Sequence, residues 1–223
     1  MDTKLSCLLE PPRELFSRNH LKPNSTNEKG IYIMVMAISS SHTGTHSVPL
    51  AISCMNTTGP VLEMGCGLYS TLMLHTICEK QGRRLHTVDH TLSWLKKFMH
   101  LESQSHTFEY LKCGSLNVTI YEFMYRFSPH WSKKIDESWD QVGNGDRWGL
   151  VFLDQLPLSR RVKDIKRLRA STDVFVIHNT NMLGNWLFGF WPYLKTFPYI
   201  YIFPAFPATV VCSDITDVRL FFQ

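Results

Sequence analysis

Short apolar runs alternate with amphipathic stretches from residue 60 onward. Runs of strand length occupy residues 60–64, 84–90, 107–113, 148–154 and 173–179. Stretches with helical spacing lie between them at 69–82, 91–101 and 160–170, and this alternation predicts βαβ units around a parallel sheet. Two further strand-like runs, 199–203 and 208–214, are separated by a turn with Pro204 and Pro207. We therefore expect an α/β fold with a doubly wound, mostly parallel sheet that ends in an antiparallel C-terminal strand pair.

The helical stretches also predict which side chains face the core. The stretch 160–170 carries Val162, Ile165 and Leu168 on one stripe, so its lysines and arginines are expected on the solvated side. Gly82 is the expected stop of the first helical stretch. In the first two stretches, the positions expected to face inward are Leu72, Leu74, His75 and Cys78, and then Leu92, Leu95, Phe98 and Met99.

The chain before this alternation is organised differently. Residues 1–30 are rich in proline, asparagine and charge, which is typical of an arm with one short helix near Glu14. An apolar run follows at 31–38, and residues 48–55 predict a short helix that tolerates Pro49 in its first turn. We therefore divide the chain into an N-terminal arm, 1–45, that packs on the core, and one domain, 46–223.

Composition limits the functional classes. The chain has 223 residues, of which 44% are hydrophobic and 19% charged, as in ordinary globular proteins. Its net charge of +4 is too small to indicate nucleic-acid binding, and no apolar run has the length of a membrane-spanning helix. The six cysteines are scattered and the N-terminus lacks the pattern of a signal peptide, so we expect a cytoplasmic protein without disulfides.

The segment "VLEMGCGLYS" places two glycines between a predicted strand and a predicted helix. Such a loop directs backbone N–H groups at the carboxyl edge of the sheet, and Gly65 and Gly67 carry no Cβ that would keep a ligand away. The next strand ends in Asp89, a position from which a carboxylate holds the ribose of a nucleotide-type cofactor. The loop lacks the third glycine of a dinucleotide-binding motif, because position 70 is Ser.

Glu63 followed by "GCG" resembles the first motif of the class I S-adenosylmethionine-dependent methyltransferases. "LHTVDH", "LKCGS", "WGLVFLDQLPLSRR" and "DVFVIHNT" resemble later motifs, the last two those of small O-methyltransferase-like proteins. The resemblance implies a Rossmann-like fold over roughly residues 45–217 and S-adenosylmethionine as cofactor. It implies that Glu63, Gly65, Cys66 and Gly67 line the methionine end and that Asp89 binds the ribose. His90 would pack against the cofactor's edge, and Gly114 and Ser115 would border the adenine.

Candidate catalytic residues follow the fourth and fifth predicted strands. Asp154 ends one strand, and His178 with Asn179 ends the next. Metal-dependent O-methyltransferases hold Mg²⁺ with an Asp and an Asp-Asn pair at these places; a histidine in the pair weakens a magnesium site, so a divalent metal stays an open alternative. His178 would otherwise serve as a general base with a pKa near 6.5. The structural alternatives are a helix N-cap for Asp154 and a hydrogen-bonded strand end for His178. His42 and His46 lie in the polar loop upstream, for which a plain polar loop is the favoured interpretation and a contribution to the pocket rim the alternative.

An aromatic run follows the fifth strand, with Trp186, Phe188, Phe190, Trp191 and Tyr193. Such rings would roof an acceptor pocket, although filling the core is the favoured interpretation. The sequence predicts an S-adenosylmethionine-dependent methyltransferase that acts on an oxygen of a small-molecule acceptor, without nucleic acid or membrane as partner. The alternative is a degenerate, non-catalytic protein with this cofactor-binding fold that acts through partners.

Overall fold

The computed structural model describes residues 45–113, 118–180 and 189–223. Several predictions lie outside these ranges: the helix near Glu14, the apolar run 31–38, His42, Gly114 with Ser115, and the aromatic residues Trp186 and Phe188. Almost all of the predicted arm, 1–45, also lies outside them.

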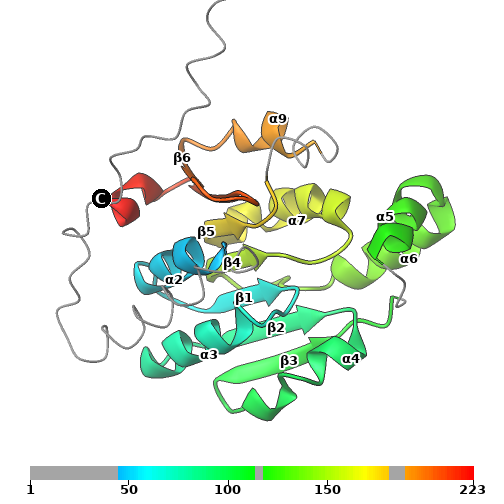
Figure 1. Ribbon diagram of the computed structural model, residues 1–223, viewed down its shortest axis with the longest axis horizontal. Coiled ribbons are helices and arrows are strands. Elements are labelled where there is room, and N and C mark those ends of the chain that lie inside the picture. The colour runs from blue at the N-terminus through cyan, green and yellow to red at the C-terminus, as the bar shows by residue number, and fades with distance from the viewer. Residues whose placement is uncertain (1–44, 114–117, 181–188) are drawn as a thin grey trace, which may run out of the picture.

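The core of the protein is one seven-stranded sheet with the order β3-β2-β1-β4-β5-β7-β6. The first five strands in this order are parallel, and β7 is antiparallel to both β5 and β6. The fold-class prediction, including the antiparallel C-terminal pair, is confirmed (Figure 1). The strands are β1 (Val61–Met64), β2 (Leu85–Asp89), β3 (His106–Tyr110), β4 (Trp148–Leu153), β5 (Thr172–Ile177), β6 (Tyr199–Phe203) and β7 (Thr209–Ser213).

Helices cover both faces of the sheet (Figure 1). One face packs against α2, α3 and the 3-10 helix η5, and the other against α5, α6, α7 and α9. The central strands β1 and β4 are buried along their whole length, which explains why they read as continuous apolar runs. The helices are α2 (Ser47–Met55), α3 (Thr71–Lys80), α4 (Leu92–Leu95), α5 (Val118–Phe127), α6 (Pro129–Trp139), α7 (Arg161–Leu168) and α9 (Phe190–Leu194), with 3-10 turns η2 (Met99–Leu101), η3 (Leu158–Arg160), η4 (Arg169–Ser171) and η5 (Val218–Phe222).

Some side-chain orientations differ from the prediction. Leu72 is exposed, because α3 turns Met73, Leu74 and Ile77 toward the sheet instead. The stretch 91–101 is not one helix but the single turn α4 followed by η2. Leu95 therefore faces the core while Leu92 and Met99 are exposed.

The basic stretch of α7 is also not wholly solvated. Arg160 and Arg161 are fully buried, because carboxylates reach them inside the protein. Arg160 pairs with Asp136, Asp140 and Asp164, which come from α6, its C-cap and α7. The expectation of a solvated arginine face is therefore wrong for these two residues.

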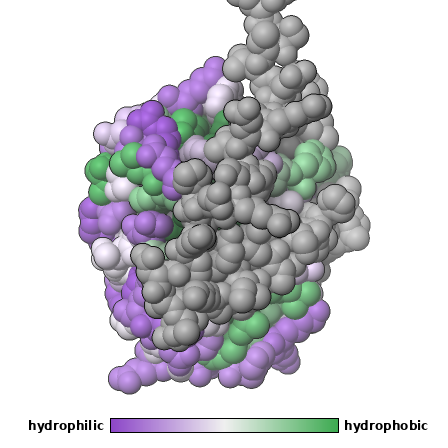
Figure 2. Space-filling view, turned by 60° about the vertical axis from the view of Figure 1, so that its left-hand side comes forward, coloured by the Kyte–Doolittle hydropathy of each residue, from purple (hydrophilic) through white to green (hydrophobic). Residues whose placement is uncertain are grey.

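Figure 2 shows hydrophobic groups next to hydrophilic residues on the part of the described surface that is visible in this view. Within the described ranges, helices are all too short or too polar to cross a membrane. Phe190 is buried in the core, as the favoured interpretation of the aromatic run predicted, and Trp191 and Tyr193 pack against the same cluster.

Candidate active site

Gly65 begins the loop between β1 and α3 and has a φ of +92°, which favours glycine. A Cβ at this position would lie 2.6 Å from the backbone nitrogen of Gln155, so the glycine is needed for the close approach of the chain after β4. The N–H of Gly65 donates to the Val88 carbonyl oxygen at 2.8 Å. The glycine therefore serves the close packing of the chain after β4, and its place at the methionine end of a cofactor stays a prediction.

Glu63 lies beneath this loop and is completely buried. Thr71 Oγ1 donates to its Oε1 at 3.0 Å and Thr87 Oγ1 to its Oε2 at 2.8 Å, while the Gly67 N–H donates to Thr71 Oγ1 at 2.9 Å. Burial raises the pKa of Glu63 to about 8 in spite of these hydroxyls. The carboxyl thus ties the loop to α3 and β2; its contact with the methionine end of a cofactor stays a prediction.

Asp89 ends β2 with its carboxylate directed at the loop. Its Oδ2 accepts the N–H of Cys66 at 3.0 Å, and its Oδ1 accepts the N–H of Thr91 at 2.7 Å. The Cys66 thiol also lies 3.5 Å from Oδ2. The structure therefore brings Asp89 and the loop residues Gly65, Cys66 and Gly67 to one place at the carboxyl edge of the sheet.

His90 follows Asp89 and is buried against α5. Its ring stacks on Tyr121 with centroids 4.6 Å apart and planes 13° apart, and the Tyr121 hydroxyl lies 3.1 Å from Cys113 Sγ. Burial lowers the pKa of His90, with Asp89 acting in the opposite direction. His90 thus forms part of the wall beside Asp89, while Gly114 and Ser115 lie outside the described residues.

The chemistry of this donor set fits a nucleoside cofactor. Asp89 Oδ1 accepts one backbone hydrogen bond and keeps a second acceptor position, and the second partner of Oδ2 is the Cys66 thiol at 3.5 Å, a weak donor that a sugar hydroxyl can replace. A sugar diol supplies two hydroxyl donors of the kind that such a carboxylate binds. The residues that would hold the cofactor are therefore Asp89 and the Cys66–Gly67 loop, with His90 beside them.

A second group of side chains lies at the ends of β4 and β5. Asp154 follows β4 and His178 follows β5, and these strands are neighbours in the sheet. Arg161, at the start of α7, joins them: its Nη2 donates to Asp154 Oδ1 at 3.1 Å and its Nη1 to the His178 carbonyl oxygen at 2.8 Å. Burial raises the pKa of Asp154 to about 6, although the Arg161 guanidinium acts in the opposite direction.

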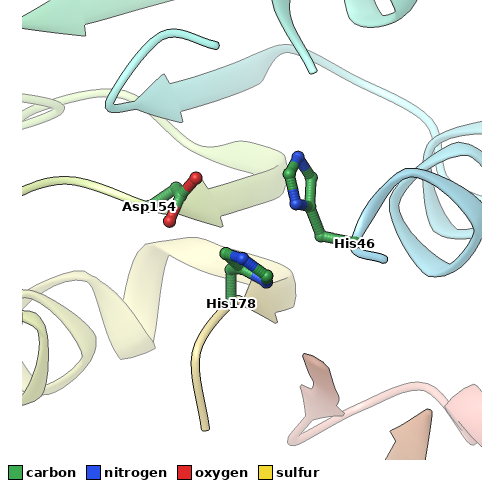
Figure 3. A group of neighbouring side chains, drawn as sticks. All are labelled: His46, Asp154 and His178. Atoms are coloured by element: carbon green, nitrogen blue, oxygen red, sulfur yellow. The ribbon is translucent and has the colours of Figure 1, made fainter. Parts of the chain in front are cut away.

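His46 completes this group from a distant part of the chain. It lies at the N-terminus of α2, and its ring is 4.4 Å from that of His178 and 5.3 Å from that of Phe152, measured between centroids. Figure 3 shows His46, Asp154 and His178 approaching one another from three elements. A ligand atom of each lies within 4.8 Å of the others.

Both histidines of this group are neutral at physiological pH. Burial, with Arg161 as a second cause, lowers the pKa of His46 to about 4. Burial, followed by His46 and Arg161, lowers the pKa of His178 to about 2. An imidazole with so low a pKa takes up a proton poorly, which argues against His178 as a general base with an ordinary pKa, and its place among the catalytic residues stays a prediction. Asn179 adopts a left-handed turn with φ of 56° directly after it.

The sequence favours a plain polar loop for His46 over a place in the site. The one feature of the sequence that points to His46 is its position just before a predicted helix. Polar residues are common at helix starts, so this position does not distinguish a site residue. Its place beside His178 follows from the packing of α2 against β4 and β5, which residue spacing does not encode. Arg161 was expected on the solvated side of its helix, whereas it binds the protein's own strand ends.

No protein-family model matches the sequence, and no curated protein matches it. Solved structures with a similar arrangement include a methyltransferase from Geobacter sulfurreducens, at 11% identity and a TM-score of 0.49, over 88% of this chain and 92% of that one. An O-methyltransferase from Bacillus cereus, in complex with SAH, has 12% identity and a TM-score of 0.45, over 88% and 94% of the two chains. The N-terminal domain of human METTL16 has 8% identity and a TM-score of 0.42, over 88% and 73%.

Because these sequence identities are low, we assign the fold from the strand order of this protein. Five parallel strands in the order β3-β2-β1-β4-β5 are followed by the antiparallel β7, inserted between β5 and β6. The glycine loop leads from the central strand β1 into α3, and Asp89 ends the neighbouring strand. The chain therefore has the Rossmann-like fold of the class I S-adenosylmethionine-dependent methyltransferases.

Proposed function

We propose that the protein is an S-adenosylmethionine-dependent methyltransferase that acts on an oxygen of a small-molecule acceptor. The observation that carries this proposal is the carboxylate of Asp89, fixed beside the Cys66–Gly67 loop at the carboxyl edge of a sheet of this topology. A carboxylate at this place supports binding of the cofactor's ribose.

The second group of side chains supports an acceptor site next to the cofactor. When bound, the cofactor supplies an activated methyl group, so the protein has to align the acceptor and exclude water. Arg161 donates to Oδ1 of Asp154 and leaves Oδ2 of the same carboxylate without this partner. Oδ2 is suited to orient an acceptor hydroxyl and to receive its proton. His178 and Asn179 would line the same space from the end of β5.

The charges of the described surface support a small acceptor rather than a nucleic acid. The arginines of the basic stretch are engaged with carboxylates: Arg160 and Arg167 with Asp164, and Arg169 with Asp214. Arginines that are neutralised in this way are poorly available for phosphate groups.

The test is a calorimetric titration of the protein with S-adenosylmethionine and with its demethylated product. We expect Asp89→Asn to weaken binding of both about 10-fold or more, since it removes the charge that binds the sugar hydroxyls but keeps an amide oxygen as acceptor. The matched control is Glu109→Gln on β3, a half-exposed acid that pairs with His86. Equal affinities of the Asp89 variant and the wild type would contradict the proposal.

A specific observation also favours a non-catalytic protein with this fold. The N–H groups of Gly65, Cys66 and Gly67 are all paired inside the protein, with Val88, Asp89 and Thr71. The loop thus offers few free N–H donors to a cofactor. In this alternative, a bound cofactor would stabilise the fold or support the binding of a partner. Binding without methylation of any hydroxyl compound in an acceptor panel would support it, and absence of binding would contradict both functions.

A further inference from the structure

His46 is a buried imidazole without a hydrogen-bond partner among the described residues. Its side chain is 95% buried, since 5% of its surface is exposed. Neither Nδ1 nor Nε2 has a hydrogen-bond partner within the described part of the chain. Leaving a buried polar group unpaired costs about 1–3 kcal/mol, so such a group in a folded protein calls for an explanation. The ring faces His178 and the carboxylate of Asp154 (Figure 3).

We propose that His46, Asp154 and His178 form a binding site for a divalent first-row transition ion of the zinc type. Two imidazoles and one carboxylate are a donor set that suits such ions, whereas Mg²⁺ prefers oxygen ligands alone. The site takes one ligand from each of three elements, the start of α2 and the ends of β4 and β5.

The distances are compatible with coordination after a small adjustment. The three ligand atoms lie within 4.8 Å of one another. Ligands of a tetrahedral zinc ion at its usual bond lengths are about 3.3 Å apart, so the side chains have to close by up to about 1.5 Å. Rotation about side-chain bonds provides movements of this size, and His46 has no hydrogen bond to break among the described residues.

The surrounding residues leave one suitable atom free on each of the other ligands. His178 Nδ1 lies 3.3 Å from Thr209 Oγ1, which leaves Nε2 for the ion. Arg161 holds Asp154 by Oδ1, which leaves Oδ2.

Arg161 determines what the ion would bind next. The buried guanidinium and a divalent cation together carry three positive charges against the single negative charge of Asp154. Three protein ligands leave the fourth position of a tetrahedral ion open, and this excess of positive charge favours an anionic oxygen there. A hydroxyl acceptor that releases its proton to bulk water meets this requirement; with the ion bound, Asp154 Oδ2 is a ligand and no longer receives that proton. This consequence rests on the proposed function, while binding of the ion does not.

The experiment uses the full chain after treatment with a chelator and in the absence of any methyl donor. Zn²⁺ is titrated against a chromophoric chelator, and Co²⁺ is used as a spectroscopic probe because its visible absorption reports the number and kind of ligands. We expect one tight equivalent of Zn²⁺, no displacement by millimolar Mg²⁺, and a rise of the melting temperature with Zn²⁺ concentration.

Two variants of the site are compared with one control. His46→Leu fills the space with an apolar side chain, and Asp154→Asn keeps an oxygen that Arg161 can bind. Each variant should weaken Zn²⁺ binding by at least about 100-fold, because replacing even a residue that only supports a metal ligand lowers metal affinity by about 10–100-fold. The control His75→Ala removes a histidine from a second close pair, in which His75 Nδ1 lies 3.1 Å from His106 Nδ1. It should bind Zn²⁺ like the wild type.

The outcomes separate this site from its alternatives. Without metal, His46→Leu should melt at or above the wild-type temperature, since it removes an unpaired polar group, so a loss of Zn²⁺ binding would not reflect unfolding. Unchanged Zn²⁺ affinity in His46→Leu, loss of the tight equivalent in His75→Ala, or no tight equivalent in the wild type would each overturn the proposal. Cofactor titrations are made separately, so the metal site and the methyltransferase function can fail independently.

Discussion

Replacing Glu63 by glutamine tests whether the glycine loop is built on a neutral carboxyl group. Glu63 is fully buried, and burial raises its pKa from 4.5 to about 8. At neutral pH the folded protein then keeps a proton that the unfolded chain releases. Glutamine has nearly the same shape, can hydrogen-bond to Thr71 and Thr87, and does not titrate.

The size of the effect follows from the two pKa values. Because the folded pKa lies above the unfolded one, the stabilisation from this group is complete below the unfolded pKa and is lost as the pH rises through the folded pKa. With values of 4.5 and about 8, the contribution of Glu63 to the free energy of unfolding falls by about 2.5 kcal/mol between about pH 5.5 and 7.5. Asp89 faces the group, and His106 reaches it through Thr87, but both are present in either protein.

The assay is urea unfolding of the wild type and Glu63→Gln at both pH values, followed by tryptophan fluorescence. The variant should gain stability relative to the wild type by about 2.5 kcal/mol as the pH rises. Glu109→Gln, a half-exposed acid on β3, should show no comparable change and serves as control. If the free energies of the wild type and Glu63→Gln change in parallel with pH, the carboxyl is ionised in the folded protein and the reasoning is refuted.

Two further predictions concern stability and are checked by denaturant unfolding. Gly65→Ala should lower the free energy of unfolding by about 2–4 kcal/mol, because the added Cβ would lie 2.6 Å from the Gln155 backbone and φ is +92°. The control Gly82→Ala, with φ of +64° and open space around it, should lower it by about 1 kcal/mol. Equal losses in the two variants would contradict the close approach at Gly65. Arg160→Ala should cost about 3–5 kcal/mol because it removes a fully buried guanidinium and leaves the buried Asp164 with Arg167 as its remaining charged partner among the described residues, and Arg147→Ala, which removes an exposed pair, less than about 1 kcal/mol. Similar midpoints for both arginine variants would show that the buried network does not stabilise the fold.

The parts of the fold that the sequence predicts are those with a local signal. The buried strands appear as apolar runs of the right length, and the helices between them require a parallel sheet. Since parallel strands end at the same edge, Asp89 was expected beside the glycine loop, and its bond to the Cys66 N–H confirms that neighbourhood.

The remaining parts depend on partners that are distant in the sequence. Helical spacing assigns Arg160 to the solvent, but Asp136 and Asp140 approach it from α6, more than 19 positions earlier. His46 reaches the carboxyl edge of the sheet because α2 packs on β4 and β5. The side chains of Arg160 and His46 are therefore positioned by tertiary packing, which periodicity does not report.

The central claim is that the carboxyl edge beside Asp89 binds an adenosyl cofactor, and the most direct measurement is a crystal structure with the demethylated cofactor bound. The account predicts sugar hydroxyls within hydrogen-bond distance of the Asp89 carboxylate and the sulfur facing the space between Asp154 and His178. A ligand bound elsewhere, with Asp89 contacting only the N–H groups of Cys66 and Thr91, would contradict it.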